Sequence, residues 1–382
     1  MFASTAPQVL RRSRALESAV FAIVAVALTI LGWALLAARP TGTDSTIPAL
    51  PARDVERIRS IAYTVSEGTV DQLYLRTLDG DGEPRLIATL PFALDARARG
   101  AASPMGDNLA VIWVPTTAAA ARLSLFSMPE GERTDIEGSY DYLTTIAWAP
   151  DGTRLAVVSY GPSDASGRVT ATVVAVDVPG GQTTPAATFE SVFVAAPVGY
   201  GLDGRLFVVT IDPRGSVLWV VRDGQVEQVA SLSSGRTRDW RLSPDGSRLA
   251  YIEVVGGAEQ RRYVGRVMFT ATGQVTPAGS AGDHLGVAWI PGTEVPVFGG
   301  PGGSLRLWGA ETDDAYVVPY DWSPDGTTLA AAVYASVSDD GVTLEPSIEL
   351  VTPERRTRLA DEPDARFLGW VLNPGMGGAG EE

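Results

Sequence analysis

A short phrase recurs along almost the whole chain. It is clearest at Trp322–Ala330 (Trp-Ser-Pro-Asp-Gly-Thr-Thr-Leu-Ala), with good copies at Ser103–Ala110, Trp148–Ala156 and Leu242–Ala250 and degenerate ones at Gly201–Leu206, Trp289–Gly292 and Trp370–Gly375. With Pro104, Pro150, Leu202, Pro244, Pro291, Pro324 and Pro374 taken as equivalent, the steps are 46, 52, 42, 47, 33 and 50 residues. A repeat near 45 residues with short strands between turns is typical of a β-propeller.

Each copy of the phrase predicts a tight turn between two strands. Proline presets the second turn position, aspartate can bond the nearby backbone, and glycine supplies a positive φ. The apolar runs after the turns, such as Leu155–Tyr160 and Leu329–Tyr334, predict second strands. A third and a shorter fourth strand follow, so each unit predicts a four-stranded antiparallel sheet that buries its faces against neighbours in a ring.

The second strands number seven, so we expect a seven-bladed propeller over residues 55–374. The first unit lacks the strand that should precede Ser60, and an unmatched strand occurs at Arg366–Leu372. We therefore expect this C-terminal strand to be the innermost strand of the first blade and to lock the ring. A six-bladed ring is the alternative, because the stretch from Pro291 to Pro324 is short for a full blade.

A membrane anchor is predicted ahead of the propeller. Ala19–Ala38 holds 20 uncharged residues, which as a helix span about 30 Å, the thickness of a bilayer core. Arginines precede it in the short basic segment 1–18, so the positive-inside rule keeps the N-terminus in the cytoplasm and places the propeller outside the cytoplasm. A cleaved signal peptide is the alternative, but the apolar run is longer than usual for one. Residues 39–54 read as a linker and 375–382 as a disordered tail.

Composition excludes several classes of function. The chain carries a net charge of −15, which repels phosphate backbones and argues against nucleic-acid binding. It has no cysteine and one histidine, so disulfides, thiolate metal sites and histidine-rich metal sites are excluded. No Gly-x-Ser-x-Gly nucleophile elbow occurs. We therefore expect no catalytic residue, no cofactor and no metal.

The connections between blades should converge on the mouth of the central channel. They mix charge with tyrosine, a combination that suits recognition of a peptide or protein. The candidate partner-binding residues are Arg97, Arg99, Tyr140, Asp141, Tyr142, Arg236, Arg238, Asp283, His284, Asp313, Asp314 and Tyr316. For His284, our first interpretation is a loop histidine that bonds Asp283 or the backbone.

The Trp-Ser-Pro-Asp-Gly-x-x-Leu-Ala phrase resembles the repeat of the TolB-type, WD-like β-propeller family, over roughly Arg57 to Pro374. The resemblance implies a noncatalytic extracytoplasmic propeller that binds protein partners, as TolB binds a peptidoglycan-associated lipoprotein at its channel mouth. The chain departs from TolB because it has no separate α/β domain before the propeller and carries an anchor in place of a removable signal. No family site residue carries over.

Our leading hypothesis is a single-pass protein of the cell membrane whose propeller acts as a protein-binding or scaffold module, as an accessory subunit of an envelope complex. The first alternative is a propeller enzyme, a lactonase or a glycan-active enzyme, with carboxylates lining the channel. The second is a sensor of an envelope ligand.

Overall fold

The computed structural model describes ten stretches of the chain: residues 57–78, 83–93, 96–117, 120–257, 260–278, 283–301, 316–334, 346–352, 355–359 and 365–373. All of them belong to one compact unit, Pro48–Glu382. No helix in these stretches is long and apolar enough to span a bilayer. The predicted segments 1–18, 19–38, 39–54 and 375–382 lie outside the described residues, and so do Asp313 and Asp314.

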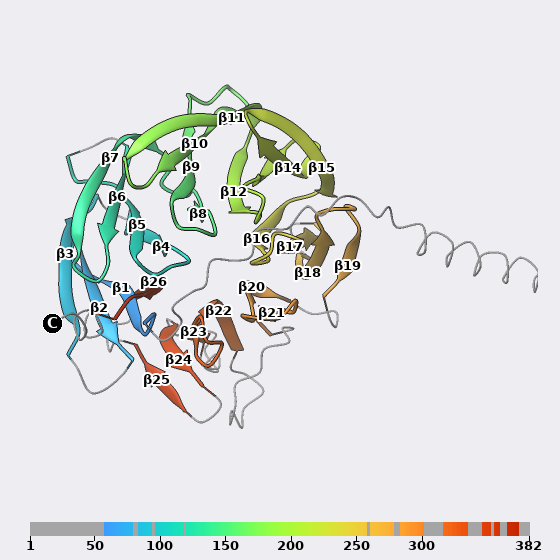
Figure 1. The fold of residues 1–382 in the computed structure, drawn as a ribbon. Coiled ribbons are helices and arrows are strands. Elements are labelled where there is room, and N and C mark those ends of the chain that lie inside the picture. Colours follow the sequence, from blue (N-terminus) through green and yellow to red (C-terminus); the bar gives the residue numbers. More distant parts are fainter. Residues whose placement is uncertain are drawn as a thin grey trace, which may run out of the picture. The chain divides into compact units, whose positions relative to one another are not determined.

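The described chain forms a ring of antiparallel sheets around a central axis (Figure 1). Blade 1 contains β26 (Arg366–Val371), β1 (Ser60–Glu67), β2 (Val70–Thr77) and β3 (Arg85–Pro91). Blade 2 contains β4 (Arg99–Ala102), β5 (Asn108–Trp113), β6 (Ala121–Ser127) and β7 (Glu132–Tyr140). Blade 3 contains β8 (Ala147–Trp148), β9 (Arg154–Tyr160), β10 (Val169–Asp177) and β11 (Gln182–Val192).

The second half of the ring follows the same order from the axis outward. Blade 4 contains β12 (Val194–Tyr200), β13 (Leu206–Asp212), β14 (Gly215–Arg222) and β15 (Gln225–Ser233). Blade 5 contains β16 (Thr237–Leu242), β17 (Arg248–Val255), β18 (Arg262–Phe269) and β19 (Val275–Pro277). A two-stranded sheet of β20 (Leu285–Trp289) and β21 (Pro296–Gly299) comes next. Blade 6 contains β22 (Tyr316–Trp322), β23 (Leu329–Tyr334), β24 (Ser347–Val351) and β25 (Arg356–Arg358).

The β-propeller is confirmed, but the prediction of seven equivalent blades is wrong. Six sheets have the four strands of a complete blade, and β20 and β21 form only a pair within the described residues. This pair lies where the repeat is shortest, in the 33-residue step from Pro291 to Pro324. A step of that length has too few residues for four strands and their turns, which was the ground for the six-bladed alternative.

The predicted ring closure is confirmed. Strand β26 pairs antiparallel with β1, with Ile61 opposite Trp370, and supplies the innermost strand of blade 1. The two ends of the described chain thus share one sheet, and their main-chain hydrogen bonds hold the ring shut. The amide of Asn373, just past β26, also donates to the carbonyl of Arg57 at 2.8 Å.

The Trp322–Ala330 copy of the phrase forms the predicted turn, with the expected positive φ at glycine and hydrogen bonds to aspartate. Gly326 has a φ of 71°. Its amide donates to the carbonyl of Ser323 at 2.8 Å. The carboxylate of Asp325 accepts from the Ser323 hydroxyl at 2.5 Å and from the Thr327 amide at 3.0 Å. Such bonds fix a turn that reverses the chain, so this aspartate is a structural residue.

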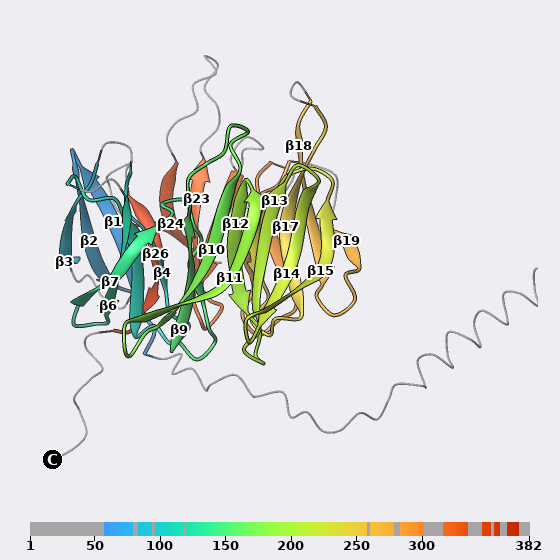
Figure 2. The ribbon, with the colours of Figure 1, turned by 90° about the horizontal axis from the view of Figure 1, so that it is seen from above.

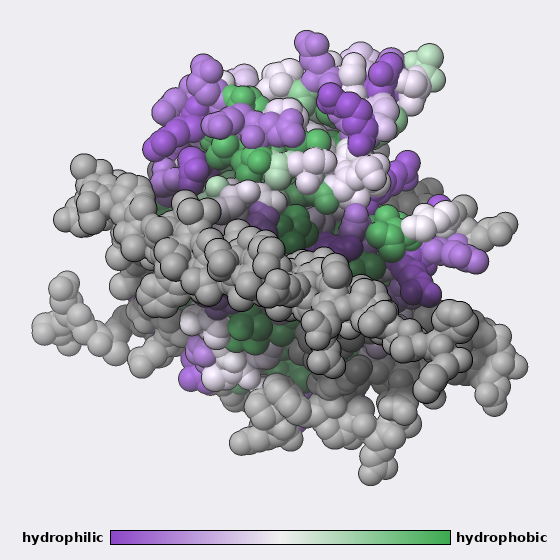
Figure 3. All heavy atoms as spheres, turned by 90° about the vertical axis from the view of Figure 1, so that its right-hand side faces the viewer, coloured by the Kyte–Doolittle hydropathy of each residue, from purple (hydrophilic) through white to green (hydrophobic). Residues whose placement is uncertain are grey.

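The core lies between adjacent sheets. Phe207 and Leu218 of blade 4 pack with Leu249, Tyr251 and Met268 of blade 5, and all five are buried. In Figure 2 the sheets stand side by side, each covered by the next. Hydrophilic side chains cover much of the outer side seen in Figure 3, with hydrophobic patches between them. Stability therefore depends on each sheet having a neighbour on both faces.

Candidate functional site

The central channel of the propeller holds a cavity of about 1010 Å³. Most of its described lining comes from the innermost strands and the segments that flank them, in five blades and the β20–β21 sheet, with Ile348 of the third strand of blade 6 and Pro346 just before that strand added. Four tryptophans occupy the same repeat position there, at or next to the end of the pairing between the innermost strand and the second strand. They are Trp148, Trp289, Trp322 and Trp370. These indoles give the channel wall a substantial apolar part.

Two of these indoles join neighbouring sheets. Trp148 Nε1 donates to the carbonyl oxygen of Ala101 in blade 2 at 3.0 Å. Trp289 Nε1 donates to the carbonyl oxygen of Arg241 in blade 5 at the same distance. In the preceding sheet, Ala102 and Leu242 hold the tryptophan position, and each acceptor is the residue just before it. The same hydrogen bond between neighbouring sheets is thus made twice around the ring. Trp322 Nε1 and Trp370 Nε1 have no such partner within the described part of the chain.

The strand order gives the two ends of the channel different chemistry. Every innermost strand runs in the same direction, so the connections that lead into these strands all lie at one end, which we call the mouth face. The Pro-Asp-Gly turns follow the innermost strands and lie at the opposite end, the turn face. The connections between blades therefore lie at the mouth face.

Arg97 lies on the connection that leads into β4, and Arg99 is the first residue of that strand; both line the channel. The hydroxyl of Tyr142, from the next connection, donates to the carbonyl of Arg97 at 2.6 Å. The guanidinium of Arg99 lies over the Tyr142 ring, 5.1 Å from its centroid. Two predicted segments from different blades thus meet at the mouth face.

A buried carboxylate holds this connection in place. Asp71 of β2 is fully buried, and it accepts the backbone N–H of Ala98 at 2.5 Å and the hydroxyl of Ser66 at 2.5 Å. Burial raises the pKa of Asp71, against the lowering effects of these hydrogen bonds and of Arg366 and Arg97. Asp71 therefore fixes the backbone between Arg97 and Arg99 from behind the channel wall.

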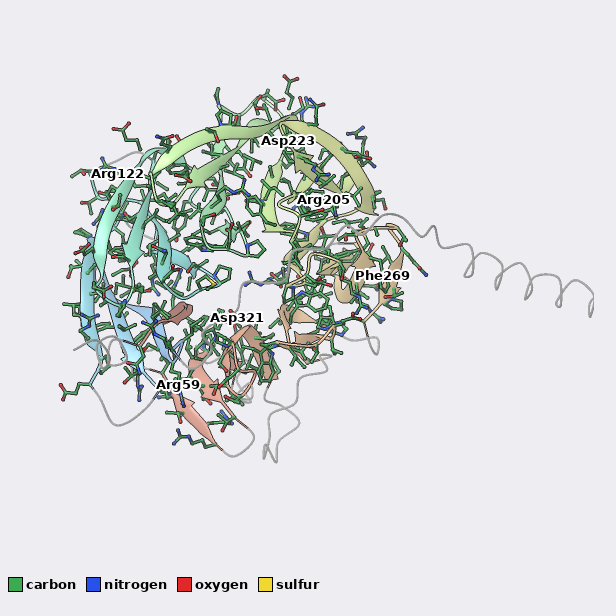
Figure 4. All side chains as sticks on the ribbon, viewed as in Figure 1. Arg59, Arg122, Arg205, Asp223, Phe269 and Asp321 are labelled. Carbon is green, nitrogen blue, oxygen red and sulfur yellow. The ribbon has the colours of Figure 1, made fainter. Side chains whose placement is uncertain are left out.

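The channel lining is cationic. Arg97, Arg99, Arg241 and Arg366 line it, while Asp321 is the one carboxylate among its described lining residues. Figure 4 places Asp321 near the centre of the ring, whereas Arg122 and Asp223 lie toward its outer rim. At neutral pH these groups give the described lining a positive charge.

Other predicted residues lie away from the channel lining or serve local structure. Tyr140 ends the outer strand β7, and its hydroxyl donates to the carbonyl of Glu137 at 2.7 Å. Burial raises its pKa to about 12. Asp141 follows it, and burial raises the pKa of this carboxyl. Neither residue lines the cavity.

The residues predicted around blade 5 mostly have partners within the fold. Arg238 forms an ion pair with Asp239 at 3.1 Å, and Arg236 is exposed. Asp283 accepts the N–H of Tyr263 at 3.0 Å. Arg236 and Asp283 lie in connections between blades, whereas Arg238 belongs to β16. None of the three is in the described channel lining.

His284 and Tyr316 also make local contacts. His284 is buried, and its Nδ1 accepts the N–H of Gly265 at 3.1 Å. Its ring meets that of Phe298 edge-on, 5.5 Å between centroids. This agrees with a loop histidine bonded to the backbone. Tyr316 stacks on Tyr334 with 4.7 Å between centroids.

Sequence reasoning missed three charged lining residues: Arg241, Asp321 and Arg366. Arg241 and Asp321 directly precede the repeat position that holds Trp148, Trp289 or Trp322 in other blades. The same position lines the channel in other blades too, where Ala101, Ala288 and Gly369 occupy it. Only an alignment of the repeats could have identified Arg241 and Asp321 as lining residues from the sequence.

No protein-family model matches the chain, and no curated protein sequence matches it. Solved structures do match. TolB from Acinetobacter baumannii is 15% identical with a TM-score of 0.47, over 82% of this chain and 66% of TolB. An oligogalacturonate lyase in complex with manganese is 15% identical with a TM-score of 0.50, over 74% of this chain and 82% of the lyase.

An acylaminoacyl peptidase from Pyrococcus horikoshii is 14% identical with a TM-score of 0.54. The match covers 79% of this chain and 51% of the peptidase, so the chain spans about half of that enzyme's length. At such identities the likeness shows the propeller fold alone.

Proposed function

We propose that this chain is a membrane-anchored, extracytoplasmic propeller that binds a protein partner at its mouth face, as an accessory subunit of an envelope complex. The anchor and its orientation come from the apolar segment 19–38 and the arginines before it. The protein-binding role comes from the sequence resemblance and from the surface at the mouth face.

One observation carries the binding role. Arg99 stacks on Tyr142, and the next residue, Leu143, has 63% of its surface exposed. Arginine and tyrosine are among the residues that carry most of the binding energy in protein interfaces, and the exposed Leu143 adds apolar surface beside them. They lie beside an open cavity, so a partner segment can contact the surface and enter the channel.

The enzyme alternative has less support from the channel. Glycoside hydrolysis commonly uses two carboxylates that flank the scissile bond. The described lining holds one, Asp321, and the described residues include no group of three or more potential metal ligands. Asp71 and Asp141, whose pKa values are raised, do not line the cavity.

Site-specific photo-crosslinking tests the proposal. A benzophenone amino acid replaces Leu143 at the mouth face or Val295 at the turn face, which are 63% and 56% exposed. Both positions are apolar and exposed, so Val295 is a matched control. In native membranes we expect one reproducible protein adduct from position 143 and none from position 295. Adducts from 295 alone, or from neither position, would refute the mouth-face assignment.

A further inference from the structure

The charge of the channel lining is opposite in sign to the net charge of the whole chain. The whole sequence has 45 acidic residues against 30 basic ones, whereas the described channel lining has four arginines and one aspartate. Outside the channel, eight arginines of the described residues form ion pairs. They are Arg133, Arg168, Arg205, Arg214, Arg238, Arg248, Arg266 and Arg356. Carboxylates are thus available to neutralise arginines on the exterior.

The channel arginines are different. The side chains of Arg99, Arg241 and Arg366 form neither an ion pair nor a hydrogen bond with any residue in the described stretches. Exposed arginines such as Arg222 also have no ion pair with another described residue, but they do not share a cavity. Like charges gathered in one concave site repel each other and attract anions from outside. The carboxyl groups of Asp71 and Asp141 attract Arg366 and Arg99 only at longer range, without a direct ion pair. The guanidinium groups in the channel therefore predict an external anionic ligand.

The arginines lie at two depths. Arg99 and Arg366 are the first residues of β4 and β26, at the mouth face. Arg241 occupies the repeat position of Ala101, two residues further along an innermost strand. A strand rises about 3.3 Å per residue, so the two levels are separated by roughly 7 Å. That is the spacing between alternate side chains of an extended peptide.

We propose that the channel binds an extended polypeptide segment whose carboxylates occur at alternate positions. The outer carboxylate contacts Arg99 and Arg366, the next contacts Arg241, and the apolar parts of the segment lie against Trp148 and Trp370. This inference rests on the proposed function, because it names the chemistry of the partner segment that enters from the mouth face. Guanidinium groups suit this role, since they bind carboxylates in a bidentate manner.

Peptide binding to the full-length protein in detergent tests the proposal. The probe is a fluorescent octapeptide of alternating Glu and Ser, and the controls are a Gln-Ser octapeptide and one with four Glu followed by four Ser. We expect the alternating acidic peptide to bind most tightly by fluorescence anisotropy, and its affinity to fall with added salt. Equal binding of the two acidic peptides would overturn the two-level arrangement. Absence of acidic-peptide binding would overturn the proposal as a whole.

Variants locate the binding. Arg99→Gln with Arg366→Gln, or Arg241→Gln alone, should weaken binding about tenfold or more. Arg168→Gln and Arg214→Gln, which remove exterior arginines paired with Asp164 and Asp212, should change it less than about twofold. Equal losses in both groups would show nonspecific attraction and refute the channel site. Tighter binding of an acidic oligogalacturonate than of the peptide would assign the channel to a glycan instead.

The two proposals fail in different ways. A protein adduct at position 143 that persists in the arginine variants would retain the protein-binding function and refute acidic recognition. An acidic peptide that binds the channel, without any adduct at position 143 in membranes, would refute the mouth-face interface and retain the anion site.

Discussion

Gly369 of β26 provides a sharp test of how the closing strand packs. A Cβ added there would lie 2.5 Å from the Cβ of Ala102 and 2.7 Å from its backbone nitrogen, in the innermost strand of blade 2. Contacts under about 3.0 Å are not tolerated, and neither atom belongs to a flexible side chain. The φ of Gly369 is 156°, at the limit of the region that favours glycine. Gly369→Ala must therefore push β26 away from β4.

We expect this substitution to lower the free energy of unfolding by about 2–4 kcal/mol, from overpacking and backbone strain together. Unfolding entropy is about 2.1 cal/mol/K per residue, so a propeller of this size should lose roughly 3–6 °C in melting temperature. Differential scanning calorimetry of the purified protein measures the change.

Gly257→Ala is the matched control, because an added Cβ there meets no atom within 4 Å and its φ is not positive. It should leave the melting temperature within about 1 °C of the parent. A Gly369→Ala protein as stable as the Gly257→Ala protein would refute the close packing of the closing strand against blade 2.

Three further predictions concern the same framework. Truncation before Arg366 exposes unpaired strand edges and should cause aggregation or degradation, and a soluble monomer with unchanged melting would refute ring closure. Asp71→Ala leaves the buried N–H of Ala98 without its acceptor and should be about 1–3 kcal/mol less stable by urea unfolding than Asp71→Asn, which keeps an acceptor. Burial raises the pKa of Asp71 above its ordinary value of 3.8, so the folded protein holds this proton more tightly than the unfolded chain. The parent should therefore lose stability as the pH rises from 3.8 to the pKa of the folded state, and Asp71→Asn should not show this loss. Trp148→Phe removes the hydrogen bond to Ala101 and should lower the free energy of unfolding by about 1 kcal/mol more than Trp322→Phe, whose indole has no partner among the described residues. Equal losses of stability would contradict this role of Trp148.

The sequence predicted most of the framework because its turns repeat. The Ser323–Gly326 turn followed from local turn chemistry. The pairing of β26 with β1 followed from a strand missing at the start of the repeats and an unmatched strand at their end. The number of complete blades did not follow. A degenerate turn at Pro291 marks a repeat unit, but it does not tell how many strands that unit contains.

The candidate site was less predictable. Arg97 and Arg99 could be placed at the channel because they lie at the end of a connection between blades and at the start of the strand that follows it. Arg241 lies within an innermost strand, and its direction toward the axis depends on the strand's register, which includes an irregularity between Arg238 and Arg241. The anchoring role of Asp71 depends on contacts between blades that no local pattern records.

The most direct test of the account combines the photo-crosslink with the acidic probe. Membranes that contain the full-length protein with the photoreactive residue at position 143 are irradiated with increasing amounts of the alternating Glu-Ser peptide. The account predicts that the partner adduct disappears as the peptide saturates the channel, while the Gln-Ser peptide has no effect. An adduct that is unchanged at saturating acidic peptide would contradict the claim that the partner enters the arginine-lined channel.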